Sequence, residues 1–108
     1  MQEDVIAEMQ GLLKETEDYE FPFFSSYEQR KILLYKKKAE IDQSMKGIVK
    51  NTAPDDFCSD AVWDSAYAEA AEQFDGMDEK QMIRSFFLQE VMHRYVEKNL
   101  EILKESYN

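Results

Sequence analysis

Apolar residues recur at helical spacing from the start of the chain. Within residues 3–18 they follow the i, i+1, i+4, i+7, i+8 pattern of one helical face, with acidic residues off that face. Pro22 then prevents further helix propagation. The pattern predicts an amphipathic helix over residues 3–18. Its apolar face consists of Val5, Ile6, Met9, Leu12 and Leu13.

A second helix is predicted over residues 26–50. Ser25 and Ser26 each precede Glu or Gln by three residues, which is the spacing of a capping box. Beyond the cap, apolar residues repeat every seven positions, as in a helix that packs along a bundle, and Met45 widens this seam. Lys38 lies on the same stripe and interrupts it. The repeating residues are Tyr27, Leu34, Ile41 and Ile48.

Two further helices are predicted over residues 56–75 and 79–106. In the first of them Trp63 anchors an apolar face, and three alanines on that face would let a neighbouring helix approach closely. Gly76 follows it as a turn residue, and Asp78 with Gln81 opens the last helix, so the two helices should be antiparallel neighbours. The alanines are Ala66, Ala70 and Ala71.

The first half of the segment 79–106 is apolar around most of its circumference, which indicates burial on all sides or contact with a partner. The aromatic segment 19–27 raises the same alternative. Its side chains would either close the end of a bundle beside Phe86 and Phe87, or form an exposed docking patch. The apolar candidates for partner binding are Phe21, Phe23, Phe24, Ile83, Phe86 and Phe87.

These patterns predict an all-α fold, a single domain of about four helices over residues 1–108. Three Gly and two Pro leave few turns, which disfavours a sandwich or barrel of many short strands. The single cysteine cannot form an intrachain disulfide, so packing must supply the stability. The N-terminus lacks the pattern of a secretion signal, and we expect a cytoplasmic protein, either a monomer or a homodimer.

The net charge is −10, with 23 acidic and 13 basic residues. A negative field disfavours nucleic acid and anionic membranes as direct ligands, and it favours a basic protein partner or simple solubility. Residues 51–77 carry seven acids and no base, counted along the printed sequence. Lysines and arginines of the second helix would neutralise these acids within the fold, or the acids would meet a basic partner. The candidate acidic face is Asp60, Asp64, Glu69, Glu72 and Asp75.

Motifs for chemistry are sparse. Glu90 and His93 match the Glu-x-x-His spacing of carboxylate-bridged di-iron bundles, with Glu97 one turn further, but the chain has a single histidine and cannot complete such a site. Cys58 lies in an acidic segment, which should raise its pKa and reduce its reactivity. No phosphate loop, CxxC, HExxH or GxSxG motif is present. We therefore expect no catalysis, no metal and no cofactor.

The sequence favours a non-enzymatic protein-binding module, of the inhibitor or immunity type, which occupies a basic surface of a partner protein. One version presents carboxylates where the phosphates of a nucleic acid would lie. The alternative is a structural or adaptor subunit that uses an apolar helix–helix interface to form homo- or hetero-oligomers.

Overall fold

The computed structural model describes residues 2–22 and 25–108. In this part of the chain it contains α-helices and two short 3₁₀ turns and no strand, which confirms the all-α fold. Four of the helices are longer than two turns. The elements in chain order are α1 (Gln2–Glu15), η1 (Thr16–Asp18), α2 (Tyr27–Val49), η2 (Lys50–Thr52), α3 (Asp60–Glu72), α4 (Glu79–Ile83) and α5 (Phe87–Tyr107).

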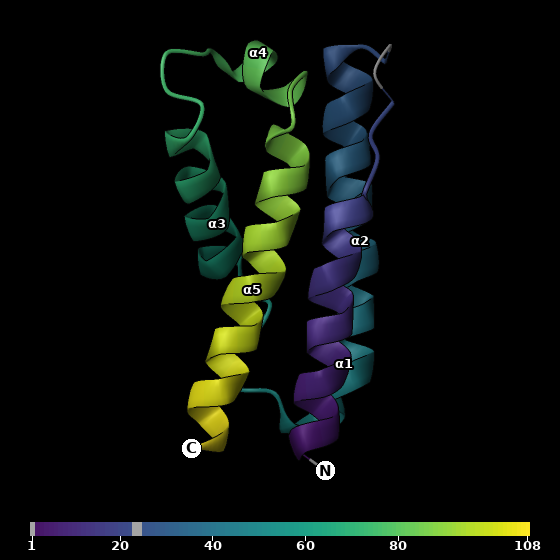
Figure 1. Ribbon diagram of the computed structural model, residues 1–108, viewed down its shortest axis with the longest axis vertical. Coiled ribbons are helices and arrows are strands. Elements are labelled where there is room, and N and C mark those ends of the chain that lie inside the picture. Colours follow the sequence, from purple (N-terminus) through teal and green to yellow (C-terminus); the bar gives the residue numbers. More distant parts are fainter. Residues whose placement is uncertain (1, 23–24) are drawn as a thin grey trace.

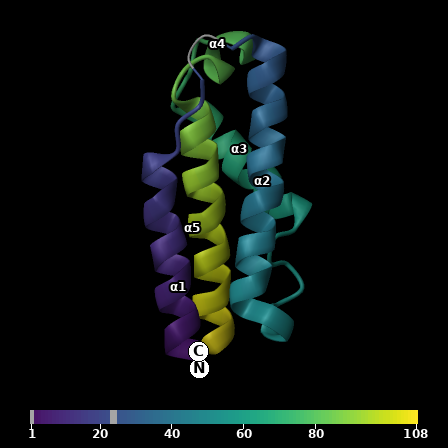
Figure 2. The ribbon, with the colours of Figure 1, turned by 90° about the vertical axis from the view of Figure 1, so that its right-hand side faces the viewer.

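The helices form a bundle around α5. Helices α3 and α1 lie on opposite sides of α5 in Figure 1, and the view in Figure 2 shows α5 between α1 and α2. Consecutive long helices run in opposite directions, so α3 and α5 are antiparallel, as the turn at Gly76 predicted, whereas α2 and α5 are parallel. The start of α1 and the end of α5 lie at one end of a molecule 42 Å long, and α4 lies at the other end (Figure 1). We call this second end the α4 end.

Helix starts follow the capping signals in the sequence. Ser26 and Gln29 form a capping box at the start of α2, in which each side chain accepts the other residue's backbone N–H, at 3.2 and 3.1 Å. Asp78 and Gln81 do the same at the start of α4. Helix α3 begins only at Asp60, because the preceding Ser59 is its cap and residues 55–58 form a turn.

The core is the face of α5 that meets the other helices. Small side chains let α3 approach α5 closely, since Ala66 and Ala70 have no exposed surface. Trp63 of α3 packs edge-on against Tyr95 of α5, with ring centroids 5.0 Å apart. Each fully buried aliphatic side chain of this core contributes about 1.5–3 kcal/mol. Leu34, Ile41 and Met45 of the predicted α2 seam are buried in it.

The predicted continuous helix over residues 79–106 is wrong, because the chain breaks between Ile83 and Phe87. In a continuous helix the Ile83 and Ser85 carbonyls would accept the N–H groups of Phe87 and Gln89. Here Arg30 of α2 donates to both carbonyls, from Nε to Ile83 at 2.6 Å and from Nη2 to Ser85 at 3.1 Å. The Phe87 N–H is left to the Ser85 hydroxyl, at 3.3 Å. A tertiary contact therefore replaces the helical bonds at the break.

Candidate functional site

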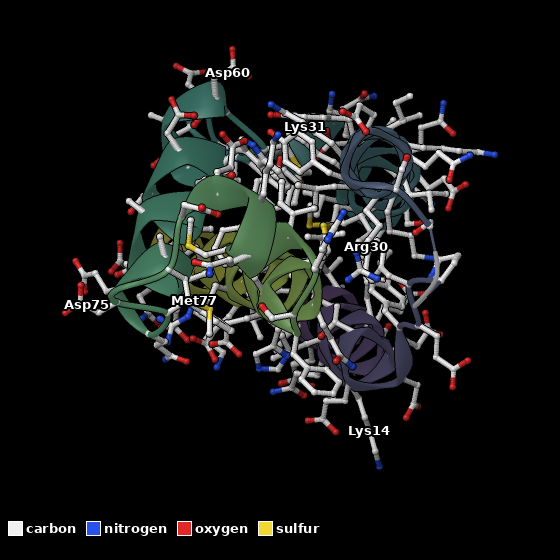
Figure 3. All side chains as sticks on the ribbon, turned by 90° about the horizontal axis from the view of Figure 1, so that it is seen from above. Lys14, Arg30, Lys31, Asp60, Asp75 and Met77 are labelled. Atoms are coloured by element: carbon white, nitrogen blue, oxygen red, sulfur yellow. The ribbon has the colours of Figure 1, made fainter. Side chains whose placement is uncertain are left out.

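The predicted acidic face of α3 is placed mostly in solvent. Asp60, Asp64, Glu72 and Asp75 are exposed, and Figure 3 shows Asp60 and Asp75 pointing away from the bundle. Glu69 differs, because its carboxylate forms an ion pair with Lys98 of α5 at 2.5 Å. At 100° per residue, Glu69 lies about 140° around α3 from Asp64. Four of the five predicted acids thus remain unpaired in the described chain, three of them on the outer side of α3 and Asp75 in the turn after it.

The lysines of α2 do not neutralise these acids. Lys37 and Lys38 pair with Glu40 and Asp42 of their own helix, and Lys31 pairs with Glu79 of α4. Across residues 2–22 and 25–108, no ion pair joins α2 to α3. The internal neutralisation that the sequence allowed is therefore not found in the described chain. The outer side of α3 keeps its negative charge.

The six predicted apolar residues do not form one surface. Ile83 and Phe87 are fully buried, so their assignment to a docking surface is wrong. Phe87 packs edge-on against two aromatic rings of the α3 side, those of Tyr67 and Phe74, with centroids 4.9 and 5.6 Å away. This contact fixes the start of α5 to α3.

The other four predicted apolar residues do not share one environment. Phe21 is half-buried against the core, and Phe86 is 80% exposed. Phe23 and Phe24 lie outside the described residues. In the described part of the aromatic segment, Tyr19 and Phe21 pack against the core and close the end of the bundle. Phe86 remains in solvent.

Arg30 organises the α4 end, and the sequence reading did not single it out. Its side chain is 3% exposed and has no carboxylate partner in the described chain. Besides Ile83 and Ser85, it donates from Nη1 to the Pro22 carbonyl at 2.8 Å. Burial lowers the pKa of this guanidinium, but arginine still keeps its proton near neutral pH. Figure 3 shows Arg30 between α2 and the green turn that joins α4 to α5.

A groove of about 930 Å³ opens beside this arginine. The short turn η1, the segment that follows it and the α4–α5 turn form its walls. We call it the Phe86 groove, because the exposed ring of Phe86 lies at its rim. The Gln89 side chain donates to the Glu17 carbonyl at 2.5 Å and holds α5 to η1 there. Its lining includes Glu17, Glu20, Phe21, Arg84, Phe86 and Gln89.

A polar network lies inside the bundle between α2 and α5. The Tyr95 hydroxyl donates to one oxygen of Asp42 at 2.6 Å, and Lys38 contacts the other oxygen at 3.0 Å. The Lys38 ammonium also lies over the rings of Trp63 and Tyr95, 5.4 and 5.6 Å from their centroids. Burial, followed by the bond to Asp42, raises the pKa of Tyr95. Lys38 thus interrupts the apolar seam because it belongs to this network.

Cys58 is held by the same region. Its backbone has φ +59°, and its N–H donates to buried Asn99 of α5 at 2.7 Å, while Asn99 donates to the Tyr95 carbonyl. Burial, with a smaller effect of nearby Asp42, raises the pKa of the thiol to about 12. The direction is the one predicted, but the main cause is burial rather than acids nearby in the sequence. Such a thiol is a poor nucleophile at neutral pH.

The Glu-x-x-His motif lies on α5, where its two side chains bond to other groups of the protein. His93 Nδ1 contacts the buried Thr16 hydroxyl at 2.7 Å, and that hydroxyl donates to the Leu13 carbonyl. Glu90 pairs with Arg94 instead. Among the residues that the structure describes, no three His, Cys, Asp or Glu side chains are placed to hold a metal ion.

One signal in the sequence pointed to Arg30. It lies three residues after Tyr27 and four before Leu34, on the same stripe as the seam, and is therefore a buried position by periodicity. No such signal marks the break at residues 84–86, which contains neither Pro nor Gly.

In the described ranges, no helix is long and apolar enough to cross a membrane. Comparison of the chain with known protein families, curated proteins and solved structures finds no match in any of the three.

Proposed function

We propose that this chain is a non-enzymatic protein-binding module that occupies a basic surface of a partner protein. The observation that supports this most directly is the outer side of α3 with the turn after it, where four carboxylates are exposed and make no ion pair within the described residues. They are those of Asp60, Asp64, Glu72 and Asp75. Asp60 and Asp64 are one turn apart, so their repulsion costs about 0.2–0.5 kcal/mol in the free chain. A cationic surface would relieve that repulsion.

The rigid placement of α3 makes this face suitable for recognition. Trp63, Ala66 and Ala70 fix the opposite side of the helix against α5, so the backbone that carries the carboxylates keeps a constant position. Complementary charge would mainly accelerate association and select basic partners. An inhibitor or immunity protein that blocks a nucleic-acid-binding surface would work in this manner, because its carboxylates would take the place of phosphates.

The test is a comparison of two doubly charge-reversed baits. Asp64→Lys with Glu72→Lys alters the α3 face, and Glu8→Lys with Glu101→Lys makes the same change of net charge at exposed positions of α1 and α5. Tagged wild-type and variant proteins would be used to capture partners from the cells that make the chain, at about 0.1 M and about 1 M salt, where the screening length falls from about 10 to 3 Å.

We expect a basic partner that the wild-type and control baits retain at low salt, and that is lost at high salt and from the α3 bait. A partner that the α3 bait retains as well as wild type would refute the proposal. Circular dichroism of each bait would verify that the reversals leave the helices intact.

An alternative function, as a structural or adaptor subunit, has one observation in its favour. Ile32 and Tyr35 are exposed on α2, one turn apart. The seam residues Leu34 and Ile41 are no longer candidates for such an interface, because the chain buries them itself. A stable oligomer in light scattering that Ile32→Asp dissociates would favour this second function.

A further inference from the structure

The position of Phe86 is unusual for the fold. It comes directly before α5 and its side chain makes no capping hydrogen bond. Phe86 contributes to the start of α5 through its backbone, because its carbonyl accepts the Glu90 N–H at 3.1 Å. Any residue at this position would supply that acceptor. The neighbouring Phe87 is fully buried, whereas Phe86 is 80% exposed. An aromatic ring at this position gives the isolated chain almost no burial.

The surroundings of Phe86 are preorganised. Arg30 holds both walls of the Phe86 groove through the carbonyls of Pro22 and Ser85, and Gln89 ties α5 to η1. A second, smaller recess of about 320 Å³ also borders Phe86, and its lining includes Thr16 and His93. The ring thus borders two hollows whose walls are joined by hydrogen bonds. Such rigidity reduces the entropy that an incoming segment must lose on binding.

The charges at the groove are unequal. Glu17, Asp18 and Glu20 line one side, all exposed, and none of them makes an ion pair in the part of the chain that the structure describes. Arg84 is the exposed cation on the other side, since the charge of Arg30 is buried against carbonyls. A guest that carries positive charge next to an apolar side chain is therefore complementary to the groove.

From this geometry we infer that the Phe86 groove binds a short basic segment of a partner protein. One large apolar side chain of that segment contacts Phe86 and Phe21, and adjacent lysines or arginines contact the carboxylates of Glu17 and Glu20. The groove is lined by η1, which follows α1, and Figure 1 shows α1 on the opposite side of α5 from α3. The inference therefore does not rest on the acidic face of α3. The chain then has two separate contact surfaces for basic proteins.

The probe is a library of random 12-residue peptides displayed on phage and selected on the immobilised wild-type chain. The selected sequences would be synthesised with a fluorophore, and their affinities measured by fluorescence polarisation. We expect the selected peptides to share lysine or arginine beside a large apolar residue. Selection of acidic peptides, or of no common sequence, would overturn the inference.

Variants then locate the binding surface. Phe86→Ala should weaken peptide binding about tenfold or more, as for a central interface aromatic, whereas Ile32→Ala, which removes another exposed apolar side chain, should leave it unchanged. Glu17→Lys with Glu20→Lys should weaken binding, and Arg84→Glu should strengthen it. Equal affinity for wild type and Phe86→Ala, or the opposite signs for the charge variants, would refute the assignment.

The two proposals remain distinguishable. Asp64→Lys with Glu72→Lys, which tests the α3 face, should leave the affinity of the selected peptides within about twofold of wild type, apart from the small effect of the distant charges. If these reversals abolished peptide binding while Phe86→Ala did not, the peptides would bind at α3. The groove inference would then be wrong and the proposed function would stand.

Discussion

The two adjacent phenylalanines at the start of α5 give the sharpest test of the structure. We expect Phe87→Ala to destabilise the fold severely and Phe86→Ala to have little effect. Phe87 is fully buried against Tyr67 and Phe74, whereas 80% of Phe86 is in solvent. The two substitutions remove the same atoms from neighbouring positions, so the difference between them depends on their environments.

The magnitudes follow from burial. Replacing a fully buried Phe by Ala costs about 3–5 kcal/mol, because a cavity remains. Full burial of a Phe side chain contributes about 1.5–3 kcal/mol, so the fifth of Phe86 that is buried contributes about 0.5 kcal/mol. For a domain of this size 1 kcal/mol corresponds to about 4–8 °C in Tm. Phe87→Ala should therefore lower Tm by more than about 12 °C, and Phe86→Ala by about 2–4 °C.

The assay is thermal and urea unfolding followed by far-UV circular dichroism. Ile32→Ala is the matched control, since it removes a side chain that is 67% exposed on α2. Its Tm should change as little as that of Phe86→Ala. Similar losses for Phe86→Ala and Phe87→Ala would show that both rings are packed. Such a result would refute the break between α4 and α5, and with it the exposure of Phe86.

Two further predictions concern buried polar groups. Arg30→Met should lower the free energy of unfolding by about 2–4 kcal/mol in urea titrations, because three carbonyls lose a charged donor. Arg30→Lys should restore only part of this stability, because an ammonium group lacks the planar fork of a guanidinium. Full stability of the lysine variant would contradict the forked geometry. Cys58, with a pKa of about 12, should react with a disulfide reagent at pH 8 about a thousandfold more slowly than an ordinary thiol, and about tenfold faster for each added pH unit up to about pH 11. A rate at pH 8 near that of free cysteine would show that the thiol is not buried as described.

Local signals in the sequence predicted most of the fold. The capping residues Ser26 and Asp78 each place a helix start within a residue, because a cap depends on side chains three positions apart. The seven-residue repeat identified Leu34 and Ile41 as core residues, and the apolar face of the third predicted helix identified Trp63 as the anchor of α3. These features depend on spacing along one helix, which a single sequence contains in full.

The break between α4 and α5 could not be read from the sequence. Residues 84–86 are compatible with a helix, and the segment from 79 to 106 contains neither Pro nor Gly. The helix ends because a side chain more than fifty positions earlier in the chain takes its carbonyls. Such a tertiary contact overrides the local helix propensity, and the pattern of residues along one segment does not reveal a contact with another helix.

The candidate acidic face was predicted in part, for a related reason. Composition showed that residues 51–77 carry acids without bases, and the exposed positions of Asp64 and Glu72 agree with that expectation. The pattern could not separate Glu69 from them, because its partner Lys98 belongs to another helix. Charge along a segment predicts which residues are ionic, whereas the packing of helices decides which of them remain unpaired.

The break in the last helix and the candidate groove have a common origin in Arg30. A lysine has no planar fork and would lose its proton more readily on burial, whereas a guanidinium stays charged and directs donors to three separate carbonyls. The bond to Ser85 keeps Phe86 in a turn rather than in a helix, and the bond to Pro22 holds the segment after α1 opposite this turn. Had Ile83 and Ser85 kept their helical bonds, the turn that forms one wall of the groove would not exist. The residue that the fold requires at this end therefore also shapes the surface that we expect to recognise a basic partner.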